Sequence, residues 1–166
     1  MKKGFTLIEL LIVIAIIAIL AGVVFVSLNP SKRFQDARNA ARWTDVTAVL
    51  SAIKVDQVDN GGGYLDGPAG KSIADLTAND STNYMIGTAV SGCNATACSA
   101  VTASANCIDL TDLSAQGYLG RIPVSPAGAG SWSDSLTGYY LAKKINGSLT
   151  IGACDAENGE TIEVNR

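Results

Sequence analysis

The sequence predicts an α+β fold in which a long N-terminal α-helix packs on a small antiparallel β-sheet. Three patterns predict it. Residues 5–28 are apolar apart from one charge, residues 31–58 show helical periodicity, and residues 139–166 contain short strand-like runs separated by Asn-Gly pairs. Strands joined by such short turns pair antiparallel, and one face of the resulting sheet would cover the helix.

Residues 5–30 are expected to form a helix that crosses a membrane, because about 20 apolar residues span the hydrocarbon core. Lys2 and Lys3 precede the run and favour a cytoplasmic N-terminus. Glu9 stands inside the run, where an ionised carboxylate costs about 2.5–3.5 kcal/mol at the centre of a span. A plain membrane anchor does not explain Glu9, which needs a cation, such as the free amine that a neighbouring copy beginning at Phe5 would offer.

Residues 31–58 are expected to continue as an amphipathic helix after an interruption at Pro30, which removes a helix hydrogen bond. The apolar positions form one stripe that predicts the core face: Trp43, Val46, Val49, Leu50 and Ile53. The basic side chains of this segment are expected on its other surfaces, near lipid headgroups or paired with acidic residues of adjacent subunits. They are Lys32, Arg33, Arg38 and Arg42.

The region 59–138 begins with a helix-ending run of Asn and Gly residues and has weaker patterns. Residues 72–77 and 109–115 are predicted to be short helices, and residues 82–89 a strand. Residues 87–106 are small and polar, which predicts a surface loop pinned by cysteines.

The four cysteines, Cys93, Cys98, Cys107 and Cys154, lie outside the apolar run. They contain no C-x-x-C pair, which disfavours a zinc site. Two disulfides in an extracytoplasmic compartment are expected instead. Spacing leaves three connectivities open, and we favour Cys93–Cys98 with Cys107–Cys154, so that Cys154 ties the sheet to the loop that carries the other three.

Residues 139–166 are predicted to form a three-stranded antiparallel meander. Asn146-Gly147 and Asn158-Gly159 are expected to be type I′ turns, which need positive φ at both central residues. The acidic residues of 155–160 could ligate Ca²⁺, but they do not match an EF-hand loop, and a solvated turn is the favoured interpretation. No metal site is therefore predicted.

Composition excludes several classes of function. The chain has 166 residues, no histidine and a net charge of −3, with a charged fraction of 16%. Phosphate-contacting nucleic-acid binding is disfavoured by this charge. Without histidine the commonest general base is missing, and no nucleophile motif, G-x-G-x-x-G or P-loop is present, so neither an enzyme nor a bound cofactor is expected.

The start of the chain resembles the class III signal of type IV pilins and pseudopilins. The resemblance rests on Gly4-Phe5-Thr6-Leu7-Ile8-Glu9 after a short basic leader and before an apolar run, and it covers about residues 1–60. It implies cleavage by prepilin peptidase between Gly4 and Phe5, removal of a 1–4 leader, N-methylation of Phe5, and a role for Glu9 in assembly.

The resemblance further implies a structural subunit that polymerises with itself and with other pilins on an inner-membrane assembly platform. The subunit would be a single-pass protein of the cytoplasmic membrane before assembly and part of an extracytoplasmic filament afterwards. A secretion-system pseudopilin or minor pilin in a short periplasmic filament is the alternative. A cleaved secretory signal fits less well, because Thr6 and Glu9 interrupt its apolar region.

Overall fold

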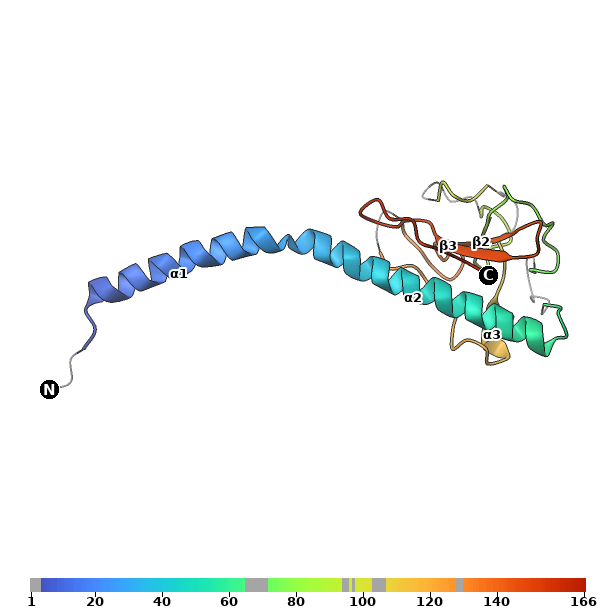
Figure 1. Cartoon of the computed structure of the whole chain (residues 1–166), viewed down its shortest axis with the longest axis horizontal. Coiled ribbons are helices and arrows are strands. Elements are labelled where there is room, and N and C mark those ends of the chain that lie inside the picture. Colours follow the sequence, from blue (N-terminus) through green and yellow to red (C-terminus); the bar gives the residue numbers. More distant parts are fainter. Residues whose placement is uncertain (1–3, 65–71, 94–95, 97, 103–106, 128–129) are drawn as a thin grey trace. The chain divides into compact units, whose positions relative to one another are not determined.

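The computed structural model describes residues 4–64, 72–93, 96, 98–102, 107–127 and 130–166 (Figure 1). Its helices are α1 (Leu7–Leu28), α2 (Pro30–Asp59) and α3 (Thr111–Ala115), and its strands are β1 (Tyr84–Met85), β2 (Tyr139–Lys143), β3 (Leu149–Ala153) and β4 (Glu163–Asn165). The chain divides into two compact units, residues 1–35 and 36–166, which we describe separately. The predicted α+β fold is confirmed, with α2 packed on a small antiparallel sheet in the second unit.

Helix α1 ends where the interruption was predicted. Asn29 adopts a left-handed conformation with φ of 39°, and the right-handed helical conformation is disfavoured at this residue because a proline follows it. The Arg33 Nε donates to the Leu28 carbonyl oxygen at 3.1 Å, which satisfies an acceptor freed at the end of α1 and places a positive charge there. Pro30 therefore causes the break, and the Arg33 side chain caps the end of α1.

The sheet has the order β1-β2-β3-β4 with every neighbouring pair antiparallel. Strands β2, β3 and β4 are the predicted meander, with Leu141 opposite Ile151 and Ile151 opposite Val164. The strand predicted at 82–89 is only two residues long. After it, the Ile86 N–H still donates to the Tyr139 carbonyl of β2, and Ile86 also forms an isolated bridge to Ile108.

The two Asn-Gly turns differ. Asn158 and Gly159 both have positive φ, at 58° and 72°, as a type I′ turn requires. At the other pair only Gly147 has positive φ, at 82°, and its N–H donates to the Lys144 carbonyl. The prediction of a type I′ turn at Asn146-Gly147 is therefore wrong. The loop has three residues, Ile145, Asn146 and Gly147, and Gly147 forms a glycine bulge at its end.

The core lies between α2 and one face of the sheet. Four of the five predicted stripe residues are buried there, namely Val46, Val49, Leu50 and Ile53, against Tyr139, Leu141, Leu149, Ile151 and Ile162. The prediction is wrong for Trp43, which is 40% exposed. The buried stripe continues instead through the polar residues Arg42 and Asn39, because the C-terminal loop supplies hydrogen-bond partners for them.

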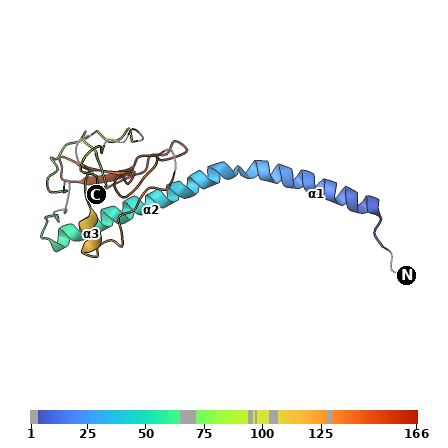
Figure 2. The ribbon, with the colours of Figure 1, turned by 180° about the vertical axis from the view of Figure 1, so that it is seen from behind.

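A second apolar cluster covers the opposite face of the sheet, where the cysteine-containing segment lies on the side away from α2 in both views (Figures 1 and 2). Side chains alternate along β2, so Tyr140 packs here with Met85 and Val101 while its neighbours face α2. Gly152 makes room for the Tyr140 ring, since a Cβ on it would lie 2.4 Å from a ring carbon. The described residues of the predicted loop at 87–106 are mostly exposed and are tied down by disulfides, as expected, while Cys93, Cys98 and Val101 are buried against the sheet.

The predicted helix at 109–115 is confirmed as α3, whereas the one at 72–77 is wrong. There the Asp75 carboxylate accepts from the Ser72 N–H at 3.1 Å and from the Ser72 hydroxyl at 3.0 Å, which closes a single turn. Short polar side chains that bond nearby backbone compete in this way with helix formation.

Both disulfides exist, but the favoured pairing is wrong. The bonds are Cys93–Cys107 and Cys98–Cys154, with Cα atoms 5.2 Å and 4.8 Å apart. Backbone pairing explains the difference: the Cys107 N–H donates to the Ala89 carbonyl and Ile108 bridges to Ile86, which brings Cys107 beside Cys93. Cys154 still ties the sheet to the cysteine segment, as expected, but through Cys98.

Removing the Cys98–Cys154 bond is expected to destabilise the second unit more than removing Cys93–Cys107. The two bonds close sequence separations of 56 and 14 residues, and loop-closure entropy grows with length within a typical range of about 2–4 kcal/mol. Urea unfolding of the Cys98→Ser/Cys154→Ser and Cys93→Ser/Cys107→Ser variants, in the full chain, measures both losses. An equal or reversed order would contradict this ranking.

Candidate functional site

The N-terminal residues form a defined helix start. Thr6 is the N-cap of α1, and Phe5 before it is 88% exposed. The Glu9 Oε2 accepts from the Thr6 N–H and from the Thr6 hydroxyl, both at 2.8 Å, while the Glu9 N–H donates to the Thr6 hydroxyl oxygen at 3.3 Å. Glu9 is therefore part of a capping box, which satisfies backbone groups that a helix start leaves unpaired.

Thr6 is a residue of this site to which the sequence pattern gave no role. The pattern did contain the capping box, because a Ser or Thr three residues before a Glu, at the start of an apolar run, predicts one. Glu9 was expected to need a cation, yet one of its oxygens is already held by Thr6 in the same chain. No hydrogen bond from a described residue reaches its other oxygen, Oε1, which leaves that atom for an external partner.

Beyond this cap, helix α1 presents an apolar surface except at Ser27. None of its 22 residues is buried, and at 1.5 Å per residue it is about 33 Å long, enough to cross the hydrocarbon core. One helical stretch in the described part of the chain, beginning at Leu7, passes this test of length and composition. So large an apolar surface must be covered by lipid or by protein.

A second charged assembly lies within the 36–166 unit, where α2 meets the C-terminal loop. Arg42 is fully buried, with its Nε 3.3 Å from Asp155 Oδ1 and its Nη1 3.2 Å from Glu157 Oε2. Arg38 binds both carboxylate oxygens of Glu157. Ser125 and Trp132 complete the shell of Asp155 through hydrogen bonds of 3.0 Å and 2.9 Å.

Two predictions are corrected by this assembly. Arg38 and Arg42 do not lie free on outer surfaces for adjacent subunits, because their partners are in the same chain. The solvated turn expected at residues 155–160 is confirmed for residues 158–160, which are exposed, but it is wrong for Asp155, which is buried and carries an ion pair. Among the described residues, no group of three His, Cys, Asp or Glu side chains is placed to hold a metal ion.

The arginines make part of the stability depend on pH. The hydrogen bond from Arg38, followed by that from Arg42, lowers the pKa of Glu157 below its ordinary 4.5. A lowered folded-state pKa contributes stability that is complete above the unfolded pKa and is lost as the pH falls through the folded value. The unfolding free energy is therefore expected to fall below about pH 4.5.

Glu157→Gln should reduce the dependence of the unfolding free energy on pH below about pH 4.5. Arg38→Gln should reduce it in part, because it removes the largest cause of the lowered pKa of Glu157. Urea unfolding at a series of pH values from 3 to 6 measures the slopes. If both variants kept the wild-type slope, Glu157 would not be the titrating group.

The outer face of α2 is exposed and carries small or apolar side chains. We define this face by Trp43, Thr44, Thr47, Ala48 and Ser51, which line a shallow depression. The Thr44 and Thr47 hydroxyls donate to the carbonyls of Ala40 and Trp43, at 3.1 Å and 2.8 Å. Their polar atoms are thereby satisfied within the helix, and their methyl groups are left for a neighbour.

Comparison with known proteins adds one finding at the N-terminal site. Residues 1–25 match the family model of the prokaryotic N-terminal methylation motif, so the motif includes the capping box and most of α1. Neither the search of curated proteins nor that of solved structures found a match.

Proposed function

We propose that this chain, which carries the class III signal of type IV pilins and pseudopilins, is a structural subunit of a pilus-like extracytoplasmic filament. The observation that carries the proposal is the match at residues 1–25 in continuity with a helix that is apolar except for Glu9 and Ser27 and has no buried residue. Prepilin peptidase would cut between Gly4 and Phe5 and methylate the new amine of Phe5.

Helix α1 must be kept out of water both before and after assembly. Each square ångström of apolar surface removed from water contributes about 25 cal/mol, so the 22 residues of α1 cannot remain in solvent. The helix lies in the cytoplasmic membrane before assembly and is transferred to a filament core, against the same helix of other subunits, on an inner-membrane assembly platform. Both environments cover the apolar surface, which makes the transfer feasible.

Glu9 supplies the specificity of assembly. In the membrane its charge is stabilised by the Thr6 cap and by the start of the helix dipole. In a filament core the Oε1 atom would face a medium where an unpaired carboxylate is expensive. The methylated amine of Phe5 in a neighbouring subunit is the proposed partner, and this contact forms only at one axial height, so it sets the register.

The outer face of α2 provides a second contact with a neighbouring subunit. Small residues let helices approach closely, and the internally bonded Thr44 and Thr47 add no unsatisfied polar group to such an interface. Trp43 borders this face and is available for burial on assembly. Each of the two units would therefore contribute its own contact with a neighbouring subunit.

The proposal is tested by the N-terminus of the mature protein. Mass spectrometry of the chain isolated from cells that contain prepilin peptidase should give a protein that begins at N-methylated Phe5. A Gly4→Glu variant should keep residues 1–4, because it removes the small residue at the cut. An uncut wild-type chain, or a cut at residue 21 or 22 as by a secretory signal peptidase, would refute the proposal.

A further inference from the structure

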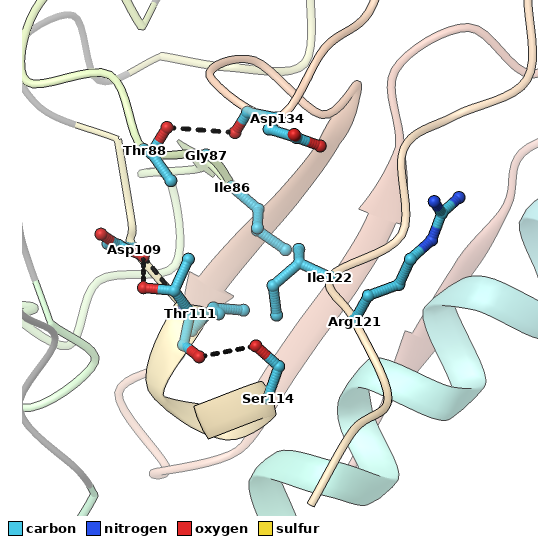
Figure 3. A pocket seen from close by; sticks show the side chains of 10 residues that line it. Ile86, Gly87, Thr88, Asp109, Thr111, Ser114, Arg121, Ile122 and Asp134 are labelled. Atoms are coloured by element: carbon cyan, nitrogen blue, oxygen red, sulfur yellow. Dashed lines mark hydrogen bonds between the residues drawn. The ribbon is translucent and has the colours of Figure 1, made fainter. Parts of the chain in front are cut away.

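A pocket of about 470 Å³ opens on the 36–166 unit, away from every contact assigned above. Its lining comes from four separate parts of the chain, which is why no local sequence pattern indicates it: residues 86–88, residues 109–111 with 114, residues 121–122 and residue 134. Its volume falls within the range of small-molecule sites. Figure 3 shows Thr88 and Asp134 on one side, Thr111 and Ser114 on the other, and Ile86 beside Ile122 between them.

The polar atoms of the pocket are almost all acceptors. The Asp109 side chain is 5% exposed, and its Oδ1 accepts from the Thr111 N–H at 2.9 Å and hydroxyl at 2.7 Å. No described residue donates to its Oδ2. The Ser114 hydroxyl donates to the Thr111 carbonyl at 2.8 Å, so its oxygen can only accept a hydrogen bond from a ligand. With the Asp134 carboxylate added, a ligand must bring several donors of its own.

The backbone around the pocket is already paired, which excludes a peptide that adds as a strand. The Ile86 N–H donates to Tyr139 and its carbonyl accepts from Thr137, while the Gly87 and Thr88 N–H groups donate to Ile108 and Asp134. Two carboxylates also disfavour phosphate-bearing ligands. Recognition therefore rests on side-chain oxygens around a floor of Ile86, Leu110 and Ile122.

We propose that this pocket binds a neutral saccharide of one or two pyranose rings. Sugar hydroxyls supply the donors that Asp109, Asp134 and the threonine and serine oxygens require, and the aliphatic floor takes the C–H face of a ring. The Arg121 guanidinium extends away from the other lining side chains in Figure 3, so the donors of this site come from the ligand. The proposal does not depend on filament formation.

The test is a binding titration with maltose, lactose, cellobiose and mannobiose, followed by ligand-observed saturation-transfer NMR. The full chain is held in dodecylphosphocholine micelles, whose headgroup contains no sugar. At least one disaccharide should bind, and Asp134→Asn and Thr88→Val should each weaken it, with about a tenfold loss for Asp134→Asn. Both positions are exposed, so neither change disturbs the core.

Asp112→Asn is the matched control, because Asp112 lies on α3 but does not line the pocket. It should bind the disaccharide as the wild-type chain does. The proposal is overturned if none of the four disaccharides binds, if Asp134→Asn and Thr88→Val bind as tightly as the control, or if spermidine binds this pocket in place of the sugars.

Discussion

Glu9→Val is expected to abolish filament assembly while the chain is still processed and folded. The variant removes the carboxylate that pairs with the Phe5 amine of the next subunit, and a buried charge left without its partner typically costs about 3–5 kcal/mol. Filament yield by electron microscopy, in a strain whose only copy carries the change, measures the effect. The processed variant should still begin at N-methylated Phe5, with a mass that differs only by the Glu-to-Val substitution, and it should contain both disulfides.

Thr6→Val separates the role of Glu9 in the capping box from its proposed pairing with the Phe5 amine of a neighbouring subunit. It removes the hydroxyl of the capping box but keeps the carboxylate, and loss of an N-cap costs about 0.5–2 kcal/mol. Filaments should therefore persist at reduced yield. If Thr6→Val and Glu9→Val lowered the yield equally, Glu9 would act only as a helix cap, and the proposed contact between subunits would be wrong.

Arg42→Leu is expected to destabilise the folded unit by about 3–5 kcal/mol. The change leaves the buried Asp155 with Ser125 and Trp132 as its remaining hydrogen-bond partners, neither of which carries a charge. Urea unfolding of the full chain in micelles, followed by tryptophan fluorescence, gives the loss. Because Trp132 bonds Asp155 directly, its emission should also report the local change.

Arg38→Leu is the matched control for Arg42. Its side chain is 33% exposed, and a partly solvated ion pair contributes about 0–1 kcal/mol. The double variant Arg42→Leu/Asp155→Leu should recover much of the loss, because both buried charges are then gone. If Arg38→Leu and Arg42→Leu lowered the unfolding free energy equally, the burial of Arg42 would not explain its contribution to stability.

Local patterns predicted the parts of the fold that local physics determines. The apolar run, the stripe through Val46 and Ile53, and the strands next to the Asn-Gly pairs each depend on neighbours within a few residues. The helix break at Pro30 follows from one residue type. The capping box at Thr6 and Glu9 was equally visible in the sequence, and was missed because the carboxylate was considered only as a charge.

The features that escaped prediction depend on contacts between distant segments. Arg42 appears as a surface cation until the loop that carries Asp155 and Glu157 is placed beside it. The disulfide pairing follows from the bridge between Ile86 and Ile108, which no spacing of cysteines reveals. The same holds for the pocket, whose lining comes from four segments.

The most direct test of the proposed function is the composition of filaments sheared from cells that produce this chain. Peptide mass mapping of the purified filaments should identify this chain as a subunit that begins at N-methylated Phe5 and contains the Cys93–Cys107 and Cys98–Cys154 bonds. A chain that stays in the membrane fraction and is missing from filaments, although residues 1–4 have been removed, would contradict the assignment as a filament subunit.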